Sequence, residues 1–438
     1  MGMGSAWAQS SGLPALGDGE SISLSAERQL GDRIARELYR DPDFLEDPVL
    51  DEYIQQLWAP LVKAAAARGE LSSELQERFA WRILLGRDRS VNAFALPGGY
   101  LGVHLGLIAV VGSHDELASV LAHELSHVTQ RHIARGMSDQ AKMTPWVIGS
   151  MILGVLAASK SPQGAQALIV GGQAAAVQSQ LSYSRDMERE ADRVGYGILV
   201  DAGYDPKGFV GMFAKLQQAS GLNDSGAFPY LRSHPLTTER LADMQARQQL
   251  NASAAAAPSD VAQAMLAARA RVLAQSSPDA LRAWTQDERQ AGAGRSEVQQ
   301  IGALYAATLA YLQMRNMEGA DRTLASLTDR LAKVQADKGG QGLLQAAPEM
   351  AASRWLRLLR AEVAFKQNHF EAVLTTLVPN GPQANLPRPE LIAVAQALQR
   401  LPQHPWLDGV TRQLRSTVQR SPNDAQAWQT LAGLLSLQ

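Results

Sequence analysis

The spacing of apolar residues predicts two helices near the start of the chain, after a segment rich in Gly, Ser and Pro at residues 9–24. Between residues 25 and 68, one apolar face forms at helical spacing, first from Leu30, Ile34 and Leu38 and then from Ile54, Leu57 and Leu61. Three short apolar runs at 80–85, 91–96 and 100–103 predict strands, and the Pro-Gly-Gly sequence at 97–99 predicts the turn between the last two.

Two longer helices are predicted in the middle of the chain. The first begins at Ser113, where Glu116 completes a capping-box sequence, and is expected to run to about Arg135. The second runs from Ser182 to Gly203, since glycine commonly follows the last residue of a helix. Both are amphipathic, so each is expected to bury one face.

The remainder of the chain is predicted to be helical and to form a second domain. Residues 251–261, rich in Ala, Ser and Pro, predict a linker between a domain at 25–250 and another at 262–438. Residues 310–321 and 361–372 each contain an aromatic residue, a short polar turn and then a small residue, which resembles degenerate tetratricopeptide helix pairs. Unrelated helical hairpins are the alternative. The expected fold is mainly α: an α+β domain with a small β-sheet, followed by all-α repeats.

Both ends of the chain suggest missing sequence. Ala6, Trp7 and Ala8 fit the small-x-small pattern that precedes a signal-peptidase cut, so residues 1–24 are interpreted as a leader remnant and linker. An ordinary flexible N-terminus is the alternative. Residues 427–438 look like the first helix of a pair whose partner is absent, so we expect the repeats to be truncated at the C-terminus.

Composition excludes several classes of protein. The 438 residues carry 41 Lys and Arg against 43 Asp and Glu, a net charge of −2, which is not the basic footprint of a nucleic-acid-binding protein. The absence of cysteine excludes disulfides, Cys-ligated zinc and thiol catalysis. The uncharged apolar stretch at 145–158 is shorter than the roughly 18 residues that a spanning helix needs. We expect residues 145–177 to be buried in the protein, with peripheral membrane contact as the alternative.

The strongest chemical signal is the pattern His-Glu-x-x-His at His123, Glu124 and His127. Residues i and i+4 share one face of a helix, so both imidazoles can bind a single metal ion, and Glu124 can reach a water molecule on that ion. Two exposed histidines are the first alternative. A purely structural zinc site is the second alternative, and in such a site Glu124 would have no chemical role.

Such a zinc site needs a third protein ligand. The metzincin spacing would place Gly and His at positions that are held here by Gln130 and Ile133. His132 lies one place away from the required position and is predicted to face elsewhere on the helix. A third histidine ligand from this turn is therefore not expected.

The second long helix supplies an alternative ligand. Glu188 and Asp192 are four residues apart and share a face, so one can bind the metal while the other accepts the remaining N–H of a ligand imidazole. The residues alone leave open which carboxylate plays which part. Glu190 points away from this face and is expected to be solvated.

His-Glu-Leu-Ser-His followed by Glu-Arg-Glu-Ala-Asp at 188–192 resembles the gluzincin family of zinc metallopeptidases, which includes the CAAX prenyl endopeptidases and HtpX. Residues 92–95, 98–99 and 118–132 are most similar to a periplasmic branch of this family with protease and chaperone roles in outer-membrane biogenesis. The sequences Ser-His-Pro-Leu at 233–236 and Arg-Leu-Ala-Asp at 240–243, and a tetratricopeptide tail, also match this branch.

The resemblance implies a gluzincin-type fold and one Zn²⁺ per chain, bound by His123, His127 and Glu188. It further implies that Glu124 is the catalytic base and that Asp192 orients a ligand.

The same resemblance brings His234 to the metal, either as a fourth ligand that silences the resting enzyme or as a partner of the oxyanion. Arg240 is expected to bind substrate or to hold the site, with a surface salt bridge as the alternative. His104 and His114 are expected not to be ligands.

The expected function is hydrolysis of peptide bonds in unfolded or misassembled envelope and outer-membrane proteins in the periplasm. An edge strand at Asn92, Ala93, Phe94 and Ala95 is predicted to pair with an extended substrate. The helical repeats are predicted to dock a larger partner, such as the outer-membrane assembly machinery. A chaperone with a latent peptidase and a repeat protein with an inert zinc site are the alternatives.

Overall fold

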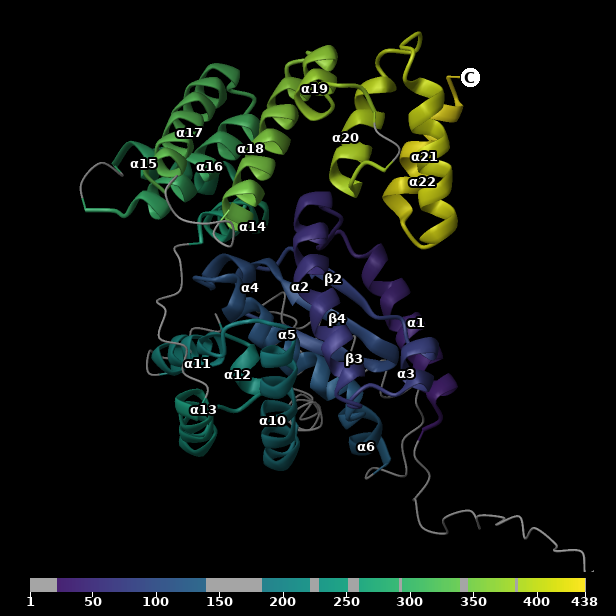
Figure 1. Ribbon diagram of the computed structural model, residues 1–438, viewed down its shortest axis with the longest axis vertical. Helices are drawn as coiled ribbons and strands as arrows, with labels where there is room; N and C mark the ends of the chain where they lie inside the picture. Colours follow the sequence, from purple (N-terminus) through teal and green to yellow (C-terminus); the bar gives the residue numbers. More distant parts are fainter. Residues whose placement is uncertain are drawn as a thin grey trace, which may run out of the picture.

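The computed structural model describes residues 22–138, 183–220, 228–250, 260–290, 294–338, 346–382 and 385–437. A lower part holds a small sheet and its covering helices, and a second stack of helices lies above it (Figure 1). The predictions for residues 1–8, 145–177 and 251–258 lie outside the described residues. Among the described residues, none of the helices combines the length and the apolar character needed to cross a membrane.

The sheet has the strand order β1-β2-β4-β3, with bounds β1 (Phe44–Leu45), β2 (Arg82–Gly86), β3 (Ala93–Leu96) and β4 (Tyr100–His104). β2 and β4 are parallel, whereas β3 is antiparallel to β4 and forms one edge. The turn between β3 and β4 contains Gly98 and Gly99 at φ 73° and 81°, which explains the two glycines. The three predicted strands are confirmed, and the short β1 was not predicted.

The helices of the lower part lie around this sheet. Their bounds are α1 (Leu24–Arg40), α2 (Pro48–Ala67), α3 (Ser73–Arg78), α4 (Leu105–Val110), α5 (His114–Thr129), α6 (His132–Ser138), α10 (Arg185–Asp201), α11 (Lys207–Ser220), α12 (Tyr230–Ser233) and α13 (Thr238–Leu250). α5 is central: it packs against α2, α10, α11 and β3, and almost all of its residues are buried. Its N-cap is Ser113, which accepts a hydrogen bond from the N–H of Glu116 as predicted. The carboxylate of Glu116 accepts from the N–H of Gly112, so only this half of the predicted capping box forms.

The prediction that this helix reaches about Arg135 is wrong. α5 ends at Thr129, and Arg131 adopts the left-handed conformation with φ 53° before α6 starts at His132. The side chain of Arg131 secures this turn, because it donates to the buried carboxylate of Glu27 and to the carbonyl of Ile22.

The upper part contains helices throughout its described residues. These are α14 (Val261–Ala274), α15 (Pro278–Gln290), α16 (Glu297–Gln313), α17 (Met317–Lys338), α18 (Ala346–Lys366), α19 (Phe370–Leu377), α20 (Arg388–Leu398), α21 (Leu407–Arg420) and α22 (Ala425–Leu435). The predicted turns join α16 to α17 and α18 to α19, with left-handed residues at Arg315 and Asn368. In the first pair the small residue has a clear reason, since a Cβ at Gly319 would lie 2.5 Å from the ring of Tyr311.

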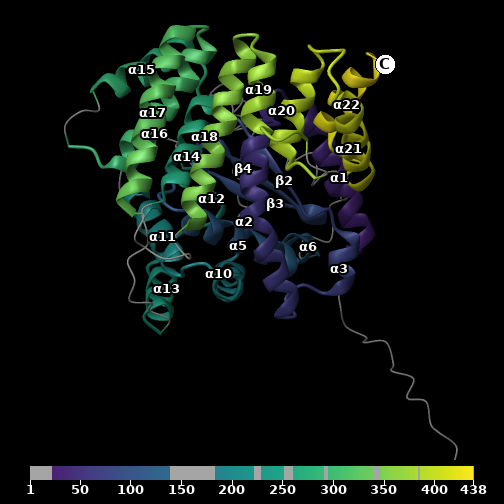
Figure 2. The ribbon, with the colours of Figure 1, turned by 45° about the horizontal axis from the view of Figure 1, so that its top comes forward.

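The two parts share their largest hydrophobic cluster, whereas α19–α22 pack mainly around a separate cluster within the upper part. A continuous cluster of buried side chains runs from the sheet and α5 through α14 to α18, and includes Leu107, Leu125, Met265, Tyr305 and Trp355. α14 lies against α4 of the lower part and against α16 of the upper part. Its place beside α16 can be followed in Figures 1 and 2. The packing therefore holds the two parts in a fixed relation.

Three buried or half-buried arginines strengthen this junction. Each bridges a carboxylate of the Asp47–α2 segment and a carboxylate of the upper part: Arg269 joins Asp47 and Glu362, Arg354 joins Glu52 and Glu390, and Arg388 joins Asp51 and Asp424. Each guanidinium lies between two carboxylates, so it reduces the repulsion between acidic side chains that come from the two parts.

Replacing Arg269 with Met should lower the free energy of unfolding by about 3–5 kcal/mol, since the buried Asp47 would lose the cation that contacts both its oxygens. Urea denaturation measures the change. Arg282→Met is the matched control, because Arg282 is exposed and forms an ion pair with Asp279 on its own helix. An equal effect of the two substitutions would contradict the role assigned to the buried bridge.

Candidate metal centre

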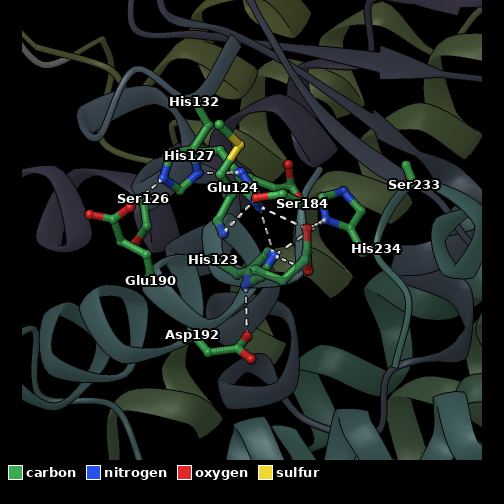
Figure 3. Close-up of polar contacts among 12 residues, drawn as sticks. His123, Glu124, Ser126, His127, His132, Ser184, Glu190, Asp192, Ser233 and His234 are labelled. Atoms are coloured by element: carbon green, nitrogen blue, oxygen red, sulfur yellow. Dashed lines mark hydrogen bonds and ion pairs between the residues drawn. The ribbon is translucent and has the colours of Figure 1, made fainter. Parts of the chain in front are cut away.

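Two packed helices and one loop bring the predicted ligands together. α5 presents His123 and His127, the first turn of α10 presents Glu188, and His234 directly follows α12. The side chains of His123, His127 and His234 point toward one another in Figure 3. All four residues are buried, and one ligand atom from each lies within 4.8 Å of the others.

Local sequence features allow the two helices to approach. Ser184 caps α10 by accepting from the N–H of Met187, which starts the helix just before Glu188. At Gly195, two turns further on, a Cβ would lie 3.0 Å from the carbonyl oxygen of Ala122. Glycine is therefore needed for α10 to pack this closely beside His123.

The distances fit a tetrahedral cation. Nε2 of His123 lies 3.0 Å from Nε2 of His127 and 3.3 Å from Nδ1 of His234. Oε1 of Glu188 lies 2.9 Å from Nδ1 of His234 and 3.5 Å from Nε2 of His127. In a tetrahedral zinc site with bonds of about 2.0–2.1 Å, neighbouring ligand atoms are about 3.3–3.4 Å apart. Three imidazole nitrogens and one carboxylate oxygen also form a donor set that suits zinc.

Glu124 occupies an unusual position beside this cluster. Its side chain has no exposure to solvent, and neither carboxylate oxygen has a hydrogen-bond partner among the described residues. The nearest ionisable atom in the cluster is Nε2 of His234, 3.4 Å from Oε1. Burying an unpaired carboxylate is costly, so its placement points to a polar group that the site takes up from outside the chain.

A second layer of charged side chains holds the first. Oδ1 of Asp192 lies 3.0 Å from Nδ1 of His123, and Arg240 donates two hydrogen bonds to the Asp192 carboxylate, at 2.6 and 2.8 Å. Arg240 also lies 2.7 Å from Oε2 of Glu188 and is only 4% exposed. Of the possibilities for Arg240, the surface salt bridge is therefore wrong, and the geometry is that of a residue that holds the site.

Charge compensation shifts the pKa values of these groups. Burial alone would raise the pKa of Asp192, but the bonds from Arg240 and His123 hold it below its usual value. Burial lowers the pKa of His123, yet Asp192 and Glu188 outweigh this and raise it to about 9. Burial and the neighbouring His123 lower the pKa of His127 well below its ordinary value. The carboxylates thus favour positive charge at the centre of the cluster, where a divalent cation would lie.

Two residues near the cluster lie where the sequence did not predict them. Nδ1 of His132 lies 2.9 Å from Nδ1 of His127, a contact that the sequence did not predict, although His132 is not among the four residues placed to hold a metal ion. Glu190 is not simply solvated, because its Oε2 contacts Nε2 of His132 at 3.1 Å and accepts from Arg135 at 2.8 Å. Both differences have one cause, the break in the helix at Arg131, which no glycine or proline signals.

Aromatic rings that the sequence did not identify enclose the imidazoles. Tyr183 stacks on His127 with ring centroids 3.7 Å apart, and Tyr230 stacks on His234 at 4.4 Å. The N–H of Tyr230 also donates to the carbonyl of Val91, which connects α12 to the start of β3. The predicted edge strand therefore lies beside the cluster.

The remaining candidate histidines lie elsewhere. His104 contacts Ser90 at 3.0 Å, and His114 contacts Asp260 at 2.5 Å. Within the described ranges, the four-residue cluster is the single group of side chains placed to hold a metal ion.

Comparison with known proteins agrees with this geometry. Residues 51–248 match the model of peptidase family M48. They form an M48 domain, which is a zinc metallopeptidase domain with Zn²⁺ as its cofactor. The family resemblance seen in the sequence is thereby confirmed.

Two of the relatives found are named for the assembly of β-barrel proteins. The chain is 36% identical over 237 residues to the putative beta-barrel assembly-enhancing protease of Vibrio cholerae, and 35% identical over 241 residues to the beta-barrel assembly-enhancing protease (BepA) of Escherichia coli. Each match covers 54% of this chain and 47% of the relative, so the chain spans about half the length of these relatives. The mitochondrial metalloendopeptidase OMA1 of Arabidopsis thaliana is 33% identical over 198 residues, which are 44% of this chain and 36% of that protein.

Purified protein should contain one zinc per chain, and His123→Ala should reduce this to background, because the substitution removes a nitrogen from the centre of the cluster. Elemental analysis after gel filtration measures the content. His369→Ala, at an exposed histidine before α19, is the matched control. Full zinc occupancy in the His123→Ala protein would contradict the assigned site.

Proposed function

We propose that this protein is a zinc-dependent endopeptidase that degrades unfolded or misassembled outer-membrane proteins in the periplasm. The observation that carries the proposal is the buried cluster of His123, His127 and Glu188, with the carboxylate of Glu124 unpaired at its side. The names of the bacterial relatives refer to β-barrel assembly and so support β-barrel proteins as the substrate class, while the periplasmic compartment rests on the resemblance seen in the sequence.

The roles of the residues follow from their positions. A bound zinc ion lowers the pKa of a coordinated water to about 7 and polarises a substrate carbonyl. His123, His127 and Glu188 are the proposed zinc ligands. Glu124 accepts the proton of the attacking water on its unpaired carboxylate and later delivers it to the departing amine. Asp192 orients the ring of His123, and Arg240 holds both Asp192 and Glu188 in place.

The substrate is proposed to bind as an added strand. β3 is an edge of the sheet and packs against α5, so a chain pairing with Asn92–Ala95 would extend past the cluster. Unfolded polypeptides supply such an extended segment readily, whereas folded proteins seldom do. Binding to the edge strand therefore selects for substrate proteins that have failed to fold or assemble.

The upper helices are proposed to be tetratricopeptide-like repeats that dock a larger partner, with outer-membrane assembly machinery as the candidate. Two helix pairs with the predicted turns, α16–α17 and α18–α19, support the repeat assignment. Since these helices share a core with the peptidase domain, a docked partner would have a fixed position relative to the active site.

A second candidate function is an assembly factor or chaperone whose peptidase is latent. The position of His234 favours it, because Nδ1 of this residue lies at hydrogen-bond distance from Glu188 and 3.3 Å from Nε2 of His123, where it would fill the fourth ligand position. In this state the imidazole restrains the enzyme until the loop after α12 moves.

Glu124→Gln should lower the rate of cleavage of an unfolded β-barrel protein by about 10²–10⁴-fold, because the amide cannot accept a proton. Gel-based proteolysis measures the rate, and zinc content should be unchanged. Glu74→Gln, at an exposed position on α3, is the matched control. If the Glu124 variant still degrades the client normally, the proteolytic assignment is wrong; if it still binds and rescues clients, the chaperone function gains support.

His234→Ala should raise the cleavage rate while leaving one zinc bound, because it frees the fourth ligand position and keeps His123, His127 and Glu188. The same proteolysis assay tests this, with His369→Ala as the control. A reduced rate would instead support the alternative role of His234 as a partner of the oxyanion, and an unchanged rate would remove the restraint altogether.

A further inference from the structure

A row of polar contacts leads from the metal cluster to the protein surface. Nδ1 of His127 lies 2.9 Å from Nδ1 of His132, and Nε2 of His132 lies 3.1 Å from Oε2 of Glu190. The same Glu190 oxygen accepts from Nη1 of Arg135 at 2.8 Å. The His132 side chain is fully buried, whereas that of Glu190 is 28% exposed and that of Arg135 is 51% exposed. Figure 3 shows His132 between His127 and Glu190.

This row depends on the break between α5 and α6. On an uninterrupted helix, a residue five positions further on lies about 140° around the axis and about 7.5 Å along it, so its side chain would point away. The left-handed residue Arg131 turns the chain back and lets the first residue of α6 face His127. A left-handed conformation costs free energy for any residue other than glycine, and here the bonds from Arg131 to Glu27 and Ile22 compensate for it.

Burial lowers the pKa values of both His127 and His132, and when both rings are neutral the protons in this row can be placed in two ways. In the first, Nδ1–H of His127 donates to Nδ1 of His132, and Nε2–H of His132 donates to the Glu190 carboxylate. In the second, His132 carries its proton on Nδ1 and donates it to His127, which leaves Nε2 of His132 without a proton facing the carboxylate. The second arrangement places an acceptor against an acceptor at Glu190 and puts the proton of neutral His127 on Nε2, the atom that faces the metal cluster.

We infer that His132 and Glu190 are positioning residues that keep the proton of His127 on Nδ1 and so present the lone pair of Nε2 to the metal. The inference rests on the proposed function, in which His127 is a zinc ligand. The two ligand imidazoles then have different supports, since His123 faces a carboxylate directly whereas His127 faces a neutral imidazole that is itself held by a carboxylate. Partners of this kind commonly contribute 10–100-fold to metal affinity.

Zinc affinity in competition with a chelator tests the inference in the full chain. His132→Leu should weaken zinc binding by about 10–100-fold, and His132→Gln should recover part of the loss, because its amide oxygen can accept from Nδ1–H of His127. Glu190→Ala should weaken binding in the same direction. Asp186→Ala is the matched control, because Asp186 lies on the same helix, is 90% exposed and pairs with the exposed side chain of Arg189.

The double variant His132→Leu/Glu190→Ala should bind zinc no more weakly than His132→Leu alone, because Glu190 acts through His132. Additive losses, or variants with the affinity of the parent protein, would overturn the inference. A parent protein that binds no zinc would instead overturn the proposed function, so the two failures are distinguishable.

A measurement on the unaltered protein avoids any variant that fails to fold. In the zinc-loaded parent, ¹⁵N chemical shifts of the histidine rings should show the proton of His132 on Nε2 and that of His127 on Nδ1. Finding the proton of His132 on Nδ1 would overturn the inference even if the substitutions weaken binding.

Discussion

The compensation of buried charge is the constraint on which the rest of the site depends. Three histidines and three carboxylates of this centre are almost entirely removed from water, and such groups are tolerated only when opposite charges lie beside them. Arg240 provides much of this compensation, because its guanidinium touches both Asp192 and Glu188. The helix that carries Arg240 is thus as necessary to the centre as the helices that carry its ligands. Glu124 is the exception, since neither of its oxygens accepts a hydrogen bond from the described residues and its contact with the cluster is the 3.4 Å approach of Nε2 of His234.

Patterns within one helix could be recognised from the sequence. The spacing of His123 and His127 fixes two imidazoles on one face, and that of Glu188 and Asp192 places two carboxylates together, although only the family resemblance separated their roles. His234 and Arg240 carried no local signal of their own, because their importance comes from a loop and a helix that fold back onto the site. The resemblance supplied both.

The remaining features depend on contacts between distant segments. The end of α5 at Thr129 is imposed by a bond from Arg131 to Glu27 in the first helix, and the residues around it include no glycine or proline to announce it. The roles of His132 and Glu190 follow from that turn and were therefore missed. The stacking of Tyr183 and the three arginine bridges were missed for the same reason, since each joins side chains far apart in the chain.

The hydrophobic cluster that the two parts share affects how the protein unfolds. α14 covers buried side chains of α4 such as Leu107, while its own Met265 is covered in turn by its neighbours. Because this apolar face is shared, unfolding of either part would expose the other part's side of it and should destabilise that part. A chain that ends before α14 would expose the apolar surface that α14 covers, and it would not form an independent enzyme. Its aggregation would result from this exposed surface and not from damage to the active centre.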